Sequence, residues 1–187
     1  MHDQTLASGL SIPQVRMEIG PSTSLNGQLG LISLDRFHSG DVVIPVKFFG
    51  DESYHSWLEF PNLTLETQRK ILDFCIGDEN GFYAPPDLNN LSASWYMNHS
   101  CSPNIGFDQE DNAVAIKEIM PGDELVYDYA FAEANPNFSF MCKCGSMSCR
   151  GKFAGDDWFK LPGLMSRYSF STSIMREKID SISSSSK

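Results

Sequence analysis

The chain is poor in basic residues and has no long apolar run. Its 187 residues contain 14 Lys and Arg against 24 Asp and Glu, and the net charge of −10 opposes broad binding to nucleic-acid phosphates or anionic lipid. No stretch approaches the roughly 20 consecutive apolar residues of a membrane helix, and the start MHDQTLASGL lacks the pattern of a secretory signal. We therefore expect a soluble intracellular protein, nuclear or cytoplasmic, without direct nucleic-acid or membrane contact. A basic partner suits the charge, although an acidic surface more often serves solubility alone.

The few cysteines argue against a second class of protein, the secreted protein stabilised by disulfides. The five cysteines are an odd number, and without a secretory signal they argue against a disulfide framework and for a metal site or free thiols. What is present is ordinary for one globular domain with a sizeable core, namely 41% apolar and 20% charged residues.

Local patterns in the first half predict short strands and one helix. Residues 15–46 combine branched apolar runs with turn-forming segments, which favours strands. The segment 62–77 has a helical period, with Thr64 as the expected N-cap and Gly77 as the expected C-cap. Residues 78–90 predict an irregular connection. The helix should bury one face, made of Leu65, Leu72 and Ile76 with Ile71 and Cys75 alongside.

The second half predicts further strands and a disordered end. The runs AVAIKEI (113–119) and ELVYDY (124–129) are typical of strands, and Pro121 and Gly122 suit the centre of a type II turn between them. Together these segments predict a hairpin. The serine-rich end DSISSSSK (180–187) predicts disorder.

Three of the cysteines lie close together in the sequence. Cys142, Cys144 and Cys149 fall within eight residues, and a tetrahedral zinc ion needs a fourth soft ligand, for which Cys101 is the natural candidate. A redox pair and free surface thiols are the alternatives, because Cys-x-Cys with a third cysteine is only moderately specific. A closed zinc site would pin the C-terminal segment against the segment 98–104.

The segment NHSCSPN (98–104) is a dense polar group between the apolar runs WYM and IGF. By itself, His99 suits either a core histidine or a catalytic base, and the asparagines suit a loop. NHSCSPN, followed by GDELVYDY and then by CKCGSMSCRGKF, resembles the signature of SET-domain lysine methyltransferases with a post-SET zinc segment. The earlier stretch GQLGLISLDRFHSGDVVIPV resembles the first SET motif, so the likeness spans roughly residues 15–153.

This resemblance implies a fold and an activity. The fold is mainly β with minor α, with several short-stranded sheets, a knot-like C-terminal segment and a post-SET zinc site. The SET domain would cover residues 15–135 with a helical insert at about 51–90, the post-SET zinc segment 136–155, and a C-terminal extension 156–187. The implied activity is methyl transfer from S-adenosylmethionine to a lysine of a basic protein or peptide, with histone tails among the expected substrates.

The resemblance also assigns roles to particular residues. Tyr129 matches the catalytic tyrosine, and Tyr127 matches a second catalytic position in the target-lysine channel, where tyrosine favours the addition of fewer methyl groups. The rest of the expected channel wall is Phe48 and Phe107. The expected cofactor contacts are Gly30, Leu31, Asn98, His99, Tyr129 and Phe153, of which Phe153 would cover the adenine, and the expected zinc ligands are Cys101, Cys142, Cys144 and Cys149.

Three departures from the family pattern keep other functions open. Gln28-Leu29-Gly30 stands where Gly-x-Gly is common, Phe48-Phe49-Gly50-Asp51 stands where many members have Tyr-x-Gly-Glu, and Trp95 replaces a basic residue. The first two motivate an alternative, a catalytically silent SET scaffold that binds a basic peptide or partner. A zinc-ribbon nucleic-acid binder is the weakest alternative, because the only basic residues near the cysteines are Lys143, Arg150 and Lys152.

Overall fold

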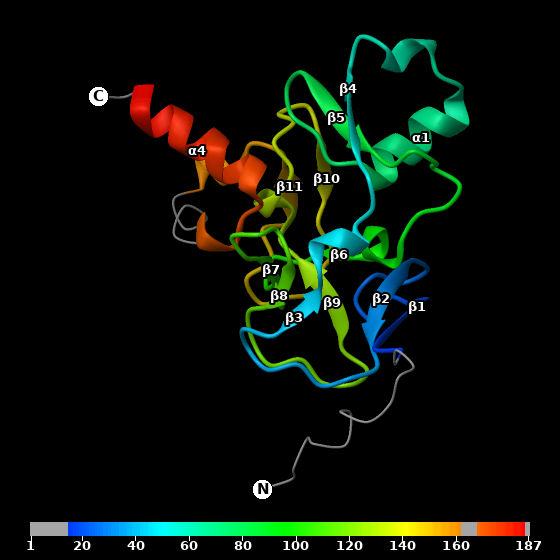
Figure 1. The fold of residues 1–187 in the computed structure, drawn as a ribbon, viewed down its shortest axis with the longest axis vertical. Coiled ribbons are helices and arrows are strands. Elements are labelled where there is room, and N and C mark those ends of the chain that lie inside the picture. The colour runs from blue at the N-terminus through cyan, green and yellow to red at the C-terminus, as the bar shows by residue number, and fades with distance from the viewer. Residues whose placement is uncertain (1–14, 162–167, 186–187) are drawn as a thin grey trace, which may run out of the picture.

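A seven-stranded sheet forms the centre of the molecule. The structure, a computed structural model, describes residues 15–161 and 168–185 (Figure 1). The strand order is β1-β2-β9-β7-β8-β3, and β6 pairs with β9 beside this path. The strands are short: β1 (Met17–Pro21), β2 (Leu29–Ser33), β3 (Val42–Ile44), β6 (Asn98–His99), β7 (Ile105–Phe107), β8 (Ala113–Ala115) and β9 (Glu124–Tyr127).

Two small sheets and a few helices surround this centre. β4 (Ser53–Ser56) pairs with β5 (Gly81–Ala84), and β10 (Ser139–Met141) pairs with β11 (Lys152–Ala154). The α-helices are α1 (Leu65–Phe74), α2 (Asp157–Lys160) and α4 (Ser173–Ser185). The 3-10 helices are η2 (Val46–Phe48), η3 (Phe60–Asn62), η4 (Ala93–Tyr96), η5 (Tyr129–Phe131) and η6 (Tyr168–Phe170). The expectation of a mainly β fold with minor α is therefore confirmed.

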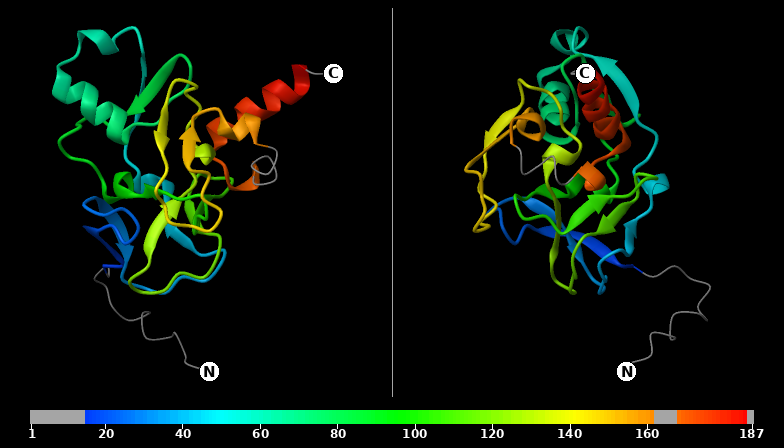
Figure 2. Two further views of the ribbon diagram at one scale, coloured as in Figure 1. Left: turned by 180° about the vertical axis from the view of Figure 1, so that it is seen from behind. Right: turned by 90° about the vertical axis from the view of Figure 1, so that its left-hand side faces the viewer.

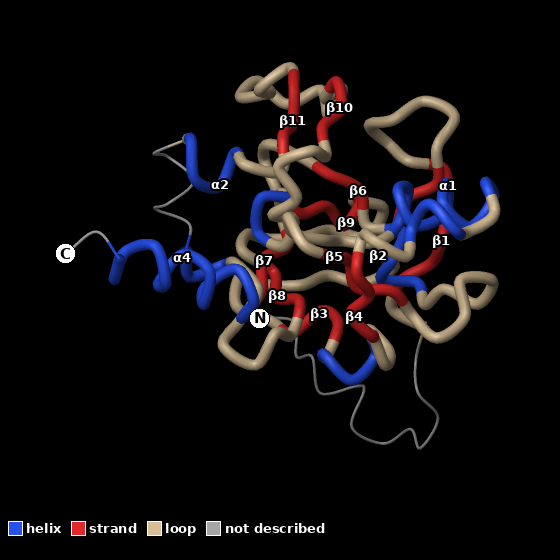
Figure 3. The backbone as a smooth tube through the Cα atoms, turned by 90° about the horizontal axis from the view of Figure 1, so that it is seen from above, coloured by secondary structure: helices blue, strands red, loops and turns tan. Residues whose placement is uncertain are grey.

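The helices occupy opposite sides of the molecule. The views in Figures 1 and 2 place α1 with β4 and β5 on one side and α4 on the other. Seen from above, the β10–β11 ribbon forms a third projection (Figure 3). The main apolar core lies in the central sheet, where Leu31, Phe37, Ile105, Ile119 and Leu125 have no exposed surface. The central sheet, which contains the main apolar core, thus lies among three peripheral parts: α1 with β4 and β5, α4, and the β10–β11 ribbon.

The predicted hairpin of residues 113–129 does not form. The turn itself is correct, because Asp123 N donates to Met120 O at 3.0 Å and Gly122 has a φ of 94°, as a type II turn requires. However, β8 pairs with β3 and β7, and β9 pairs with β2, β6 and β7. The turn carries the chain towards β2, since Gly122 N donates to Ser33 O at 2.7 Å. The two predicted strands therefore lie on either side of β7.

Helix α1 forms with the predicted N-cap but buries a different face. The Thr64 side chain accepts from Thr67 N, whereas the helix ends at Phe74 with Cys75 as its C-cap, so the expected C-cap at Gly77 is wrong. Ile71 is only 3% exposed, while Leu65 is 74% exposed. The helix covers only the small β4–β5 sheet and a few aromatic rings, and this narrow contact needs one apolar stripe through Ile71.

Two segments expected to be irregular are ordered. β5 lies within the predicted connection 78–90, where it pairs along its length with β4. Helix α4 continues to Ser185, through most of the serine-rich end for which composition predicted disorder, while residues 186–187 lie outside the described part. The apolar residues Met175 and Ile179, 0% and 6% exposed, anchor this helix in the core. Burial of one stripe thus overrides the weak helix propensity of serine.

Candidate functional site

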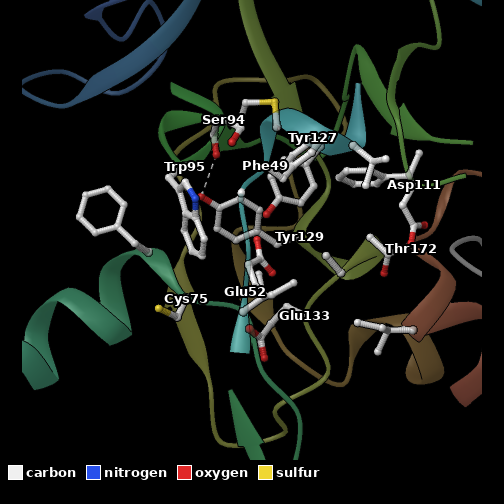
Figure 4. A pocket seen from close by; sticks show the side chains of 18 of the residues that line it. Phe49, Glu52, Cys75, Ser94, Trp95, Asp111, Tyr127, Tyr129, Glu133 and Thr172 are labelled. Carbon is white, nitrogen blue, oxygen red and sulfur yellow. Dashed lines mark hydrogen bonds between the residues drawn. The ribbon is translucent and has the colours of Figure 1, made fainter. Parts of the chain in front are cut away.

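A pocket of about 240 Å³ passes between the insert, the central sheet and the C-terminal helix. Tyr129 and Tyr127 line it, with Trp95 and Cys75 on one side of them and Asp111 and Thr172 on the other (Figure 4). The wall is largely aromatic and apolar, with four carboxylates. None of the described lining residues is Lys, Arg or His. This pocket therefore suits a slender cationic or amine-bearing group.

The two tyrosines form the narrow part of the aromatic wall. Their ring centroids are 4.9 Å apart, and Tyr127 also packs edge-on against Phe107 at 5.6 Å. The Tyr129 hydroxyl donates to Met97 O at 3.2 Å. Burial raises the pKa of both phenols above its ordinary value. Both tyrosines are consequently neutral hydroxyl groups near pH 7, available as polar contacts but not as phenolate bases.

The pocket wall contains Phe49, not Phe48. The Phe48 side chain is 59% exposed, whereas Phe49 lines the pocket and lies 6.2 Å from Phe107, ring centroid to ring centroid. The reason is local: Val46 begins a 3-10 helix, and three residues per turn place Val46 and Phe49 on the same face. The sequence prediction was therefore one residue out of register at this position.

Asn98 and Gly30 meet at a buried carboxylate. The Asn98 side-chain amide donates to Leu29 O at 2.8 Å and to Glu124 Oε1 at 2.7 Å. A Cβ atom at Gly30 would lie 2.4 Å from Glu124 Oε1, so only glycine allows this approach. Leu31, the next residue, has a fully buried side chain in the core and pairs with both neighbouring strands. Gly30, Leu31 and Asn98 are thus brought together through Glu124 and β2.

Glu124 also binds the turn before β2. Its carboxylate accepts hydrogen bonds from the hydroxyl groups of Ser22, Thr23 and Ser24, at 2.9 to 3.3 Å, and from two backbone N–H groups of the same turn. Burial opposes ionisation, but the hydrogen bonds from Asn98, Ser22 and Thr23 outweigh it and lower the pKa of the Glu124 carboxyl. Glu124 is therefore a buried carboxylate held by neutral donors, a role that the sequence reasoning missed.

His99 connects the tyrosines to the cysteines. It is 4% exposed, and burial lowers its pKa to about 4 although Asp128 opposes the shift. The ring is thus neutral near pH 7. Nδ1 accepts from Tyr129 N at 3.1 Å, so the proton belongs on Nε2, which lies 3.4 Å from Cys101 Sγ. Of the two readings left open by the sequence, the structure shows a buried, structurally bonded imidazole.

The four predicted cysteine ligands do come together. The ligand atoms of Cys101, Cys142, Cys144 and Cys149 all lie within 4.8 Å of one another, and the Cys101 and Cys142 sulfurs are 3.8 Å apart. Tetrahedral zinc with Zn–S distances of about 2.3 Å needs sulfurs about 3.8 Å apart. The donor set and its spacing fit a structural zinc ion, and the cluster is consistent with a post-SET zinc site.

A buried ion pair joins the cysteine cluster to the tyrosines. Arg150, which follows Cys149, donates from Nη1 and Nη2 to both oxygens of Asp128 at 2.6 and 2.9 Å. Asp128 is fully buried between Tyr127 and Tyr129, and it also accepts from Ala130 N at the start of η5. Arg150 Nε lies 3.1 Å from Asp157 Oδ2 but lacks hydrogen-bond geometry. The sequence identified Arg150 only as a basic neighbour of the cysteines.

Phe153 lies in an aromatic cluster and outside the pocket lining. Its side chain has no exposed surface, and its ring centroid is 5.2 Å from His99 and 5.2 Å from Phe140. An adenine stacked between two rings needs them about 7 Å apart, twice a van der Waals contact of about 3.5 Å. An adenine therefore does not fit between Phe153 and His99, and the expected role of Phe153 as a cover for the adenine stays a prediction.

Two backbone groups of Gly77 join the insert by hydrogen bonds to residues 133–134, which follow Tyr129 in the chain. Gly77 N donates to Glu133 Oε2 at 3.0 Å, and Ala134 N donates back to Gly77 O at 2.8 Å. Glu133 is 3% exposed, and burial raises the pKa of its carboxyl to about 7. No sequence motif predicted this contact, because it joins segments 56 residues apart.

The chain resembles known proteins over part of its length. The family model for the SET domain matches residues 28–130. The chain is 40% identical to histone-lysine N-methyltransferase 2D of Homo sapiens over 62 residues, which is 29% of this chain and 1% of that protein. It is 38% identical to methyltransferase flvH of Aspergillus flavus over 88 residues, 44% of this chain and 49% of that protein. An H3 lysine-9 specific histone-lysine N-methyltransferase of Schizosaccharomyces pombe is 33% identical over 109 residues, 46% of this chain and 22% of that protein.

The SET-domain match covers most of the pocket lining, including Tyr127 and Tyr129, but not the lining residues after position 130. The chain spans at most about half the length of these curated relatives. Within residues 15–161 and 168–185, no helix is long and apolar enough to cross a membrane. Because the SET-domain model covers more than half of the sequence, including NHSCSPN and both pocket tyrosines, the chain belongs to the SET-domain family.

Proposed function

We propose that this protein is an S-adenosylmethionine-dependent protein-lysine N-methyltransferase. The observation that carries the proposal is the pocket wall, in which Tyr127, Tyr129 and Phe107 form an aromatic passage next to the NHSCSPN segment. The names of the relatives support lysine as the acceptor and histones as the first substrates to test. The SET domain at 15–135, the post-SET segment at 136–155 and the extension at 156–187 remain proposed boundaries.

The passage would prepare the lysine for attack. A lysine ammonium with a pKa of about 10.4 is almost entirely protonated at pH 7, and only the free amine is a nucleophile. Aromatic walls remove water from the ammonium and so lower its pKa. The Tyr127 and Tyr129 hydroxyls stay protonated because burial raises the pKa of both phenols. As neutral hydroxyl groups they can form hydrogen bonds that orient the amine. Holding the amine nitrogen, the methyl carbon and the sulfur in line lowers the activation barrier by on the order of 7 to 11 kcal/mol.

The methyl donor would bind at the Trp95 side of the pocket. Of the residues expected to contact the donor, Tyr129 alone is in the described pocket lining; Asn98 follows the lining residue Trp95 by three positions and binds the backbone before Gly30. We assign Gly30, Leu31, Asn98, His99 and Tyr129 to this donor site; its sulfonium supplies the electrophilic methyl group. Phe153, whose ring packs against His99, remains the proposed cover for the adenine.

Zinc would have a structural part in this function. Four thiolates leave no open coordination position, which is the pattern of structural and not catalytic zinc sites. The ion would fix the position of Arg150, which donates hydrogen bonds to Asp128. Asp128 is the residue between Tyr127 and Tyr129 in the sequence. A purified sample without one equivalent of zinc per chain would contradict this assignment.

Substitution of Tyr129 tests the proposal directly. The purified protein is incubated with labelled S-adenosylmethionine and a panel of histones and cell proteins, and labelled lysines are identified by mass spectrometry. Tyr129→Phe should lower kcat by about 10²–10³-fold, the usual effect of removing one oriented hydroxyl contact, with cofactor affinity nearly unchanged. Tyr83→Phe is the matched control, because Tyr83 lies on β5 outside the pocket lining.

The same experiment separates the alternatives. Cofactor binding without transfer to any protein would favour a silent scaffold that binds a basic partner. Unchanged turnover in Tyr129→Phe would remove this residue from its proposed role. The mass of the product also reports the number of methyl groups; we expect mono- or dimethylation, because Tyr127 narrows the passage beside Tyr129.

A further inference from the structure

The C-terminal helix forms part of the pocket although it lies outside the family match. The SET-domain model ends at residue 130, whereas Thr172 and Ile174, at the start of α4, line the pocket. Figure 4 shows Thr172 and Asp111 together, on the side of the tyrosines away from Trp95. The pocket end opposite the proposed donor site is therefore built partly by a segment that the family motif does not contain.

The start of α4 is fixed by a polar clamp, defined as Asp111, Ser173 and Arg176. Ser173 N donates to Asp111 Oδ1 at 2.7 Å, and Ser173 Oγ donates to Asp111 Oδ2. Arg176 is 7% exposed; its Nη2 lies 3.3 Å from Asp111 Oδ1, and its guanidinium donates to the carbonyl groups of Asp108 and Ser171. The clamp joins α4 to the connection between β7 and β8.

Two further contacts position the same segment against the site. Thr172 N donates to Phe131 O at 2.8 Å, so the residue before α4 is bonded to the last residue of η5, the 3-10 helix that begins with Tyr129. On the far side, Lys178 pairs with Glu79 of the insert at 2.5 Å. Helix α4 is thereby bonded to the β7–β8 connection, to η5 and to the insert.

The rim at this end offers apolar surface. Ile174 is 38% exposed and Val46 is 44% exposed, and both line the pocket. They belong to one neighbourhood, because Val46 N donates to Asn112 Oδ1 at 2.9 Å, next to Asp111 of the clamp. Two partly exposed branched side chains continuous with a pocket for an amine suit an apolar side chain adjacent to that amine in the same ligand.

We propose that Ile174 and Val46 form a specificity-determining rim that binds an apolar residue flanking the target lysine, and that Asp111 is a positioning residue for this rim. The inference rests on the proposed methyltransferase function and deepens it by naming the substrate class. That class is a protein segment in which the modified lysine is followed or preceded by a large apolar side chain.

The test is a peptide library with one fixed lysine and varied flanking residues, methylated by the full chain. Wild type should prefer peptides with a large apolar flanking residue. Ile174→Asp should lower kcat/KM for those peptides by about tenfold or more, mainly through KM, and reverse the preference towards basic flanking residues. Ile182→Asp is the matched control, since Ile182 is 37% exposed on the same helix but does not line the pocket, and it should keep the wild-type preference.

Asp111→Asn tests the clamp separately from the rim. Asp111 has a φ of 61°, which asparagine also tolerates, so the turn should survive while the ion pair to Arg176 is lost. KM for apolar-flanked peptides should rise severalfold with cofactor affinity unchanged. An active wild type without an apolar preference, or Ile174→Asp with the wild-type preference, overturns the rim. A wild type that methylates no peptide and no protein instead overturns the proposed function.

Discussion

The cysteine knuckle, residues 142–151, and the insert, residues 51–90, are held to the rest of the chain in different ways. The knuckle has almost no apolar core; its main contacts to the rest of the chain are the cysteine cluster and Arg150, which binds Asp128 and lies near Asp157 and the Phe153 ring. The insert has its own core, in which Trp57, Phe60, Ile71 and Phe82 pack together. One region thus depends on the cysteine cluster, with its proposed zinc ion, and on charge, and the other depends on apolar burial.

This difference makes the two regions respond to different perturbations. Losing the metal should release the knuckle, since nothing apolar would replace the thiolate bonds. The insert should survive that loss and should instead respond to changes at Glu133, its hydrogen-bonded link to the segment after the tyrosines. Three experiments test this contrast.

Removing a zinc ligand should give the largest effect. Cys144→Ser, or chelation of the wild type, should abolish stoichiometric zinc and lower methyl transfer by more than about 100-fold, because the knuckle positions Arg150 against Asp128. Zinc analysis and hydrogen exchange of residues 140–155 provide the measurement. Cys75→Ala, in the insert, should retain full zinc content; retention of zinc by Cys144→Ser would contradict the assignment.

Truncating the Arg150 side chain should have the next largest effect. Arg150→Ala leaves the fully buried Asp128 carboxylate without its cation, which typically costs about 3–5 kcal/mol of unfolding free energy. Denaturant unfolding at constant zinc measures the loss. Arg16→Ala is the control, because Arg16 and Asp35 are 43% and 50% exposed and such a pair contributes less than about 1 kcal/mol. Equal losses in the two variants would mean that the buried pair contributes little.

The insert link should show the smallest effect, and a pH dependence. Burial raises the pKa of Glu133 from 4.5 to about 7, so the folded protein binds this proton more tightly than the unfolded chain. Its stabilising contribution is therefore full below pH 4.5 and is lost as pH rises through about 7, by up to about 3 kcal/mol. The stability difference between wild type and Glu133→Gln should fall by that amount over this range.

Glu79 provides a control because its pKa is shifted in the opposite direction to that of Glu133. The hydrogen bond from Lys178 lowers the pKa of Glu79, so its stabilising contribution is present above the ordinary pKa of glutamate and is lost as pH falls. Glu79→Gln should accordingly change the pH profile in the acidic range only. A flat difference for Glu133→Gln between pH 4.5 and 7 would show that the link is not sensitive to protonation.

The sequence predicted the parts of the site that are encoded by short motifs. Cys-x-Cys with a nearby cysteine anticipated a cluster that the structure assembles with Cys101, because thiolate spacing is a local property. The tyrosines of ELVYDY were identified by their resemblance to the SET signature; the predicted strand holds only as far as Tyr127, because Tyr129 begins η5.

Contacts between distant segments could not be predicted in this way. Nothing local in the sequence pairs Asp111 with Ser173, or Gly77 with Glu133, because these contacts exist only once the sheet order is set. The false hairpin at 113–129 has the same origin: strand order is decided by packing of the whole core and not by a turn. Phe48 was misplaced by a single residue because a short 3-10 helix changes the period.

The surroundings of Glu124 have a consequence for how the protein behaves in concentrated salt. Every donor to this carboxylate is an uncharged hydroxyl, amide or peptide group, so the anion sits in a permanent shell of oriented dipoles that replaces its water of hydration. Dissolved counterions weaken attraction between exposed opposite charges, but they have no cation to displace here. Strands β2 and β6, which carry Gly30 and Asn98, should therefore keep their mutual placement at ionic strengths that weaken the ion pairs on the protein surface.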